Sequence, residues 1–94
     1  DLPGTPDLVF PVRRKIIFVH GCFWHRHLDP DCKLARMAKS RQEFWRPKLE
    51  GNRARDFRTE EALKNAGWGV MTVWECQLKD VASLENEIRT FLDA

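Results

Sequence analysis

Residues 15–32 read KIIFVHGCFWHRHLDPDC, and this stretch indicates how the chain is built. Its first part, Lys15–Val19, is a run of β-branched and aromatic side chains, which predicts a strand. The run is apolar without alternation, which predicts burial on both faces of a sheet. From His20 to Cys32 the sequence is irregular and rich in cysteine and histidine. We therefore expect a loop that carries the chemistry directly after the strand.

The segment before this strand predicts a short partner strand. Residues 1–6, DLPGTP, are turn-forming because proline and glycine punctuate them. Leu8–Phe10 is a brief apolar run that Pro11 stops, and Arg13–Lys15 form a polar hairpin turn.

The segment after the loop predicts a long helix. It should begin near Ser40, a favourable N-cap with Glu43 three residues later. Pro47 should kink this helix or delay its start, because proline lacks the amide hydrogen that a helix interior needs. The helix then covers Leu49–Ala66 and ends at Gly67, a typical C-terminal glycine.

The last third of the chain adds one strand and one helix. Val70–Trp74 predicts a second buried strand, and Val81–Leu92 an amphipathic helix with Leu84, Ile88 and Phe91/Leu92 on one face. The order strand, strand, helix, strand, helix predicts an α/β fold, a mixed sheet flanked by helices.

Length and composition limit the class of protein. The 94 residues form one domain, 1–94, because a core rarely divides below about 150 residues. A content of 43% hydrophobic and 32% charged residues excludes a disordered tail. No stretch reaches the roughly 20 apolar residues of a membrane span, and three cysteines cannot close a disulfide framework. The cysteine content therefore favours a protein of the reducing cytoplasm. We also expect an upstream segment, because the chain begins at Asp1 rather than Met.

The net charge of +2 conceals an uneven distribution. Residues 33–58 carry nine basic and three acidic side chains, whereas residues 59–94 carry three basic and seven acidic ones. Such segregation indicates a surface for a polyanion. A solvated, arginine-rich helix explains the same pattern equally well.

Four residues have side chains of the types that bind zinc in proteins. Zinc takes four tetrahedral ligands from thiolate and imidazole, and a structural site draws all four from protein. Cys22, His27, Cys32 and Cys76 supply a Cys₃His set, with four residues on each side of His27. The alternative is that Cys76 is a small core residue and the others are incidental. A zinc site would also stabilise a domain this small.

Three further side chains have the chemistry of phosphodiester cleavage. Asp7 heads the first strand, where a carboxylate can hold Mg²⁺, which prefers oxygen ligands. His20 and His25 remain after the zinc set is assigned, and either is able to serve as a base. Taken alone, a Pro-Asp pair in a turn and a single histidine are more often structural.

Several ordered blocks resemble the very-short-patch repair (Vsr) endonucleases. The blocks are LPGTPD at 2–7, IFVHGCFWH at 17–25, EFW at 43–45, NRARD at 52–56, GW at 67–68 and VWEC at 73–76. The resemblance covers nearly the whole chain and implies a restriction-endonuclease-like core. It also implies Mg²⁺-dependent nicking of duplex DNA 5′ to the T of a T·G mismatch, the product of 5-methylcytosine deamination. Mismatch-repair proteins are the partners that it implies, and a monomer is expected.

The resemblance also implies roles for individual residues. Asp7 matches the metal-binding aspartate, with the backbone carbonyl of Val19 as a second ligand. His25 matches the histidine that activates water, Asp56 its acidic partner, and His20 a second active-site histidine. The zinc ligands match Cys22, His27, Cys32 and Cys76. The DNA contacts match three aromatic wedges, Phe23, Trp24 and Trp45, and the basic residues Arg46, Lys48, Arg53 and Arg55.

The sequence departs from the family in three places. Val19 stands where the family often has Thr, the loop before Cys32 contains Leu-Asp-Pro-Asp, and the family's N-terminal clamp is absent from residues 1–94. Two other functions therefore stay open: a homing or restriction-linked nuclease on the same core, and a catalytically inactive, zinc-stabilised DNA-binding module. Ordinary core packing also stays open for Trp45.

Overall fold

The computed structural model describes residues 2–25, 27–29, 31–35 and 41–94. The strands in this part of the chain are β1 (Leu8–Phe10), β2 (Lys15–His20) and β3 (Gly69–Trp74). The α-helices are α1 (Gln42–Asn65) and α2 (Val81–Asp93), and short 3-10 helices cover Lys33–Ala35 and Glu75–Lys79. The predicted order of strands and helices is confirmed.

The three strands form one mixed sheet in the order β1-β2-β3. β1 pairs antiparallel with β2, with Leu8 opposite Ile17. β2 pairs parallel with β3, with Ile16 opposite Val70 and His20 opposite Trp74. The parallel pair requires a crossover, which α1 provides.

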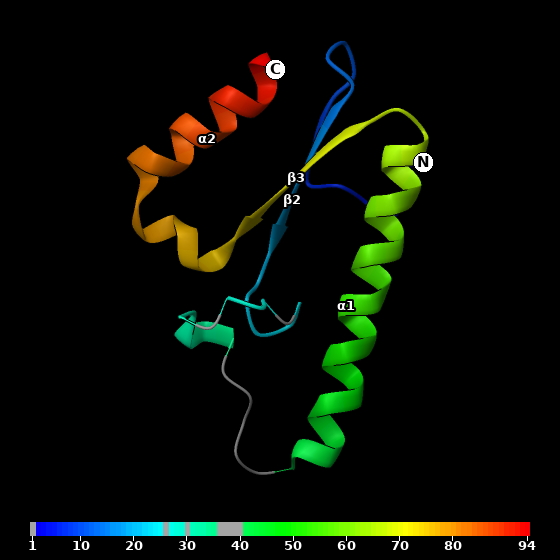
Figure 1. The fold of residues 1–94 in the computed structure, drawn as a ribbon, viewed down its shortest axis with the longest axis vertical. Helices are drawn as coiled ribbons and strands as arrows, with labels where there is room; N and C mark the ends of the chain where they lie inside the picture. The colour runs from blue at the N-terminus through cyan, green and yellow to red at the C-terminus, as the bar shows by residue number, and fades with distance from the viewer. Residues whose placement is uncertain (1, 26, 30, 36–40) are drawn as a thin grey trace.

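Helices cover both faces of the sheet. Alternate side chains of β2 point to opposite sides, so each helix packs against a different set of them. Figure 1 shows α1 and α2 on either side of β2 and β3. One core joins Ile16 and Phe18 to Leu63 of α1. The other joins Ile17 and Val73 to Leu84 of α2. Burial of three successive residues, 16–18, confirms that this strand is covered on both faces.

β3 is less buried than the sequence predicts. The 70–74 run was expected to be a buried strand, but only Val73 is buried, and the rest of β3 is half-buried. Among the described strands β3 lies at an edge of the sheet, so it has a strand neighbour on one side only.

The long helix meets the sequence prediction at its end more closely than at its start. It begins at Gln42, close to the expected start, and continues past Pro47, so the proline does not divide the helix. The predicted N-cap, Ser40, lies outside the described residues. At the other end Gly67 has φ +92°, and the amides of Gly67 and Trp68 donate to the carbonyls of Lys64 and Leu63. This is the expected glycine cap.

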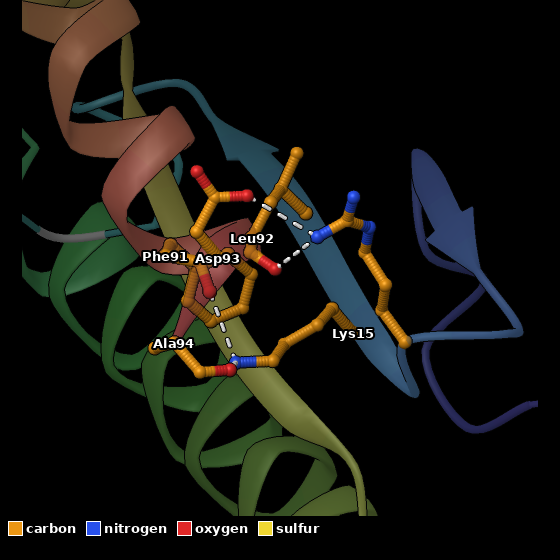
Figure 2. A network of polar contacts seen from close by, with 6 residues as sticks. Lys15, Phe91, Leu92, Asp93 and Ala94 are labelled. Atoms are coloured by element: carbon orange, nitrogen blue, oxygen red, sulfur yellow. Dashed lines mark hydrogen bonds and ion pairs between the residues drawn. The ribbon is translucent and has the colours of Figure 1, made fainter.

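Two basic residues, Arg13 in the β1–β2 turn and Lys15 at the start of β2, bind the C-terminal end of α2. The Lys15 ammonium donates to the Phe91 and Ala94 carbonyls at 2.9 and 3.2 Å (Figure 2). The Arg13 guanidinium donates to the Leu92 carbonyl at 2.7 Å. Cations are favourable at a helix C-terminus, where carbonyls lack partners within the helix. These two basic residues are therefore structural.

Within the described ranges, none of the helices has both the length and the apolar character that crossing a bilayer requires.

Candidate active site and metal centre

The candidate site lies where β2 and β3 end. Parallel strands bring their carboxyl ends to one edge of the sheet, and His20 and Trp74 are paired there. The chain after β2 turns back on itself, with the His25 amide donating to the Gly21 carbonyl at 3.1 Å. Cys22 and Cys76, each two residues past the paired position, therefore come together.

The four predicted zinc ligands converge. One ligand atom from each of Cys22, His27, Cys32 and Cys76 lies within 4.8 Å of the other three. The Cys76 Sγ lies 3.6 Å from His27 Nδ1. A tetrahedral zinc with Zn–S near 2.3 Å and Zn–N near 2.0–2.1 Å separates sulfur and nitrogen by about 3.6 Å. The donor set and its spacing therefore fit a divalent zinc-like ion.

The surroundings of these side chains also suit a metal. Cys22 is fully buried, and this burial is the main reason that the pKa of its thiol rises to about 12, although the hydrogen bond from the Cys76 amide opposes the shift. A thiolate at this position therefore requires a cation beside it. The His27 ring stacks on Trp74, with ring centroids 4.1 Å apart, which fixes the orientation of the imidazole.

A separate cleft of about 300 Å³ gathers the predicted catalytic residues. Asp7, Val19, His20, His25 and Asp56 all line it. The Val19 amide donates to Asp7 Oδ2 at 2.7 Å, which fixes the carboxylate against β2. Further lining groups are Gly4, Thr5, Phe18, Arg55, Thr59, Glu60 and Thr72.

His25 and Asp56 form a close pair in this cleft. His25 Nδ1 lies 2.6 Å from Asp56 Oδ2, and both side chains are about three-tenths exposed, at 30% and 27%. With Nδ1–H donating to the carboxylate, Nε2 is left as the basic nitrogen. This is the geometry of an oriented general base.

His20 stacks on His25, and its surroundings disfavour its protonated form. The ring centroids are 3.8 Å apart and the planes differ by 6°. Burial, and next the neighbouring His25, lower the pKa of His20, while Asp56, Asp7 and Glu60 oppose the shift. His20, His25 and Asp56 also offer atoms close enough for a metal. Parallel rings, however, keep the nitrogen lone pairs of His20 and His25 in separate planes, so the two rings are poorly placed to share one metal ion.

The predicted wedge residues form an aromatic group between the loop after β2 and α1. Phe23 and Trp24 from the loop meet Trp45 from α1, with ring centroids 5.5 and 5.9 Å away. Phe44 packs on Trp45 at 5.1 Å. Trp24 is half exposed, at 50%, and Trp45 is half-buried, so the group is partly open to solvent.

All four predicted phosphate-binding cations are exposed on α1. These are Arg46, Lys48, Arg53 and Arg55. Arg55 also lines the cleft, and Arg53 lines the neighbouring hollow that reaches His27 and Trp74.

Two further residues of α1, Asn52 and Glu60, were not predicted from the sequence as site residues. Asn52 donates from Nδ2 to the Trp24 carbonyl at 3.0 Å and accepts from Arg55 at 3.2 Å. Glu60 lines the cleft one helical turn after Asp56. The i, i+4 spacing of Asn52, Asp56 and Glu60 along α1 was the signal available for both.

Several known proteins are similar to this chain in sequence. The chain is 55% identical over 93 residues to the type II nicking enzyme V.XorIIP of Xanthomonas oryzae, a match that covers 99% of this chain and 66% of the relative. The family model for the DNA mismatch endonuclease Vsr matches residues 1–34, which hold Asp7, both cleft histidines and three of the four zinc-type ligands. The chain belongs to the Vsr endonuclease family.

Further relatives agree with this assignment. The Vsr-family chain is 44% identical over 89 residues to the DNA mismatch endonuclease Vsr of Escherichia coli, covering 95% of this chain and 55% of the relative. It is 39% identical over 95 residues to the type II nicking enzyme V.NmeAIP of Neisseria meningitidis, covering 97% of this chain and 66% of the relative. The chain thus spans between about half and two thirds of these relatives' lengths.

Proposed function

We propose that this chain carries the catalytic core of a Mg²⁺-dependent endonuclease that nicks duplex DNA 5′ to the T of a T·G mismatch. The observation that carries the proposal is the shared cleft. The fixed carboxylate of Asp7 and the His25–Asp56 pair line it together, beside a partly exposed aromatic group. Such nicking begins the repair of deaminated 5-methylcytosine in the bacterial cytoplasm, with mismatch-repair proteins as partners. The core is restriction-endonuclease-like and acts as a monomer.

The cleft suits a hard divalent cation. Mg²⁺ prefers oxygen ligands and usually binds one or two carboxylates and several waters. Asp7 presents such a carboxylate, and the Val19 carbonyl supplies a second oxygen in this proposal. When bound, Mg²⁺ neutralises charge on the scissile phosphate and on the leaving oxygen.

The protein side chains supply the proton transfers and the orientation. His25 Nε2 takes the proton of the attacking water, while Asp56 holds the ring and stabilises the imidazolium that forms. His20 stacks on His25 and lines the same cleft, where its ring would contact the scissile phosphate in this proposal. The Cys₃His centre holds a structural Zn²⁺ that keeps the loop of residues 20–32 in place.

The aromatic group supplies mismatch selectivity in this proposal. Phe23, Trp24 and Trp45 insert beside the T·G pair. Separating two stacked base pairs costs a few kcal/mol, and the cost is least at a mismatch. Arg46, Lys48, Arg53 and Arg55 bind the phosphates along α1.

A second candidate is a nicking enzyme of the same core with a different recognition site. The names of two relatives favour it, since V.XorIIP and V.NmeAIP are called type II nicking enzymes. This candidate predicts the same cleft chemistry and a different preferred duplex.

The cleft assignment is tested with Asp7→Asn in a nicking assay on labelled duplex with Mg²⁺. The variant should lose activity by about 100-fold or more, because the cation loses its charged ligand. Glu61→Gln, on the exposed side of α1, removes the same charge and should nick like the wild type. Equal activity of Asp7→Asn and wild type would overturn the assigned cation site.

A further inference from the structure

Asn52 forms a bridge between α1 and the loop that carries the aromatic and catalytic residues. Its Nδ2 donates to the Trp24 carbonyl at 3.0 Å. Its Oδ1 accepts from Arg55 at 3.2 Å. Only the amide nitrogen can donate to a carbonyl and only the amide oxygen can accept from a guanidinium, so the two partners specify one orientation of the side chain.

The bridge lies one helical turn from the catalytic pair. Asn52 and Asp56 are four residues apart on α1 and therefore share a face of the helix. Asn52 binds the main chain of Trp24, and Asp56 binds the ring of the next residue, His25, at 2.6 Å. Helix α1 thus binds two consecutive loop residues, Trp24 and His25, through the side chains of Asn52 and Asp56.

The same bridge joins the two elements that supply the aromatic group. Trp24 comes from the loop and Trp45 from α1, with ring centroids 5.9 Å apart. Trp24 is half exposed, so its position is not fixed by burial alone. The hydrogen bond from Asn52 to its carbonyl supplies a fixed point between the two elements.

We infer that Asn52 is a positioning residue that couples the aromatic group to His25 and to Arg55 in the cleft; this inference rests on the proposed function. When the aromatic rings insert into DNA, the main chain of Trp24 moves with them. The bridge from Asn52 then keeps His25, the next residue, in its catalytic position. Without the bridge, insertion of the rings no longer places His25. Both the rate of nicking and its dependence on the mismatch then fall.

The test is Asn52→Asp, which keeps the shape and the acceptor for Arg55 but replaces the donor to the Trp24 carbonyl with an oxygen. Asn86→Asp makes the same chemical change at an exposed position of α2. Amide hydrogen exchange at Trp24 and His25, measured without DNA, reports on the bridge. Single-turnover nicking of T·G and fully paired duplexes reports on the coupling.

In Asn52→Asp we expect faster exchange at Trp24 and His25 and a rate on the T·G duplex about 10- to 100-fold lower. The preference for T·G over paired DNA should shrink. Unchanged exchange would overturn the bridge, and a lower rate with undiminished preference would overturn the coupling. Failure of the wild type to nick any duplex would instead overturn the proposed function, while the exchange rates still decide whether Asn52 holds the loop.

Discussion

At His25 a single hydrogen bond decides which ring nitrogen is available for chemistry. The Asp56 carboxylate occupies the Nδ1 side at 2.6 Å, so Nε2 is the nitrogen left to accept a proton. Residue chemistry in the sequence indicated His25, but only the family resemblance indicated Asp56 and its pairing with His25, because 31 positions separate the two along the chain. Helix α1 brings the two side chains together.

Asp56→Asn tests this pair. The amide still accepts a hydrogen bond but carries no charge to stabilise the imidazolium, so kcat should fall by about 10²- to 10⁴-fold. DNA affinity should stay within about twofold, because Asp56 does not contact phosphate in this account. Single-turnover rates and binding titrations on one T·G duplex measure both quantities. A variant that nicks at the wild-type rate would remove His25–Asp56 from the mechanism.

The hydrogen bond between Asp7 and the main chain of Val19 could not be predicted from the pattern of residues. The resemblance assigned the Val19 carbonyl to the metal, but nothing in the sequence indicated the bond from the Val19 amide to Asp7 Oδ2. Main-chain contacts of this kind depend on strand register, which the sequence does not specify. The side chain of Val19 is exposed, in accord with a role for its main chain.

On the scale of elements, two glycines have opposite effects on stability. Gly4 lies in the segment before β1 with φ +76°, and a Cβ there would lie 2.4 Å from Thr59 Cγ2 of α1. Gly51 lies within α1, and a Cβ there would meet no atom within 4 Å. The first glycine permits close approach of α1 to the segment that leads to Asp7, whereas the second only weakens its helix.

Gly4→Ala should therefore lower the free energy of unfolding by about 1–3 kcal/mol. Gly51→Ala should raise it by about 0.5–1 kcal/mol, because alanine is the better helix former. Urea denaturation of both variants beside the wild type gives the two differences. If Gly4→Ala were as stable as Gly51→Ala, the tight contact between Gly4 and Thr59 would not exist.

The elements differed in how well the sequence predicted them. The 15–19 strand and the Gly67 cap were predicted because β-branched runs and C-terminal glycines act through local sterics. The burial of β3 was overestimated, because its apolar residues lie at an edge of the described sheet. Pro47 was expected to disturb the helix more than it does. It lies in the second turn, where a single lost hydrogen bond is offset by tertiary contacts such as that of fully buried Leu49.

On the scale of the whole molecule, the Cys₃His centre joins segments that are distant in sequence. Cys22, His27 and Cys32 follow β2, whereas Cys76 follows β3. A domain of this size has a small core, so a metal that closes such a long loop should carry much of its stability. The sequence predicted these four residues as a set from residue chemistry, and their convergence depends on the parallel pairing of β2 and β3.

Cys76→Ser should lower Tm by roughly 10 °C or more, because about 2 kcal/mol of lost stability shifts a domain of this size that far. A zinc chelator should lower the wild-type Tm to the same degree and leave the variant unchanged. Calorimetry and metal analysis of the purified proteins measure both effects. Equal melting temperatures with and without chelator would show that these residues hold no structural metal.

The measurement that tests the central claim most directly is the position of the nick on three labelled duplexes incubated with Mg²⁺. One duplex carries a single T·G mismatch, the second has T·A and the third has C·G at the same place. We expect a single break on the 5′ side of the mismatched T and at least about tenfold slower cutting of the paired duplexes. Equal cutting of all three, or a break at another site, would contradict it.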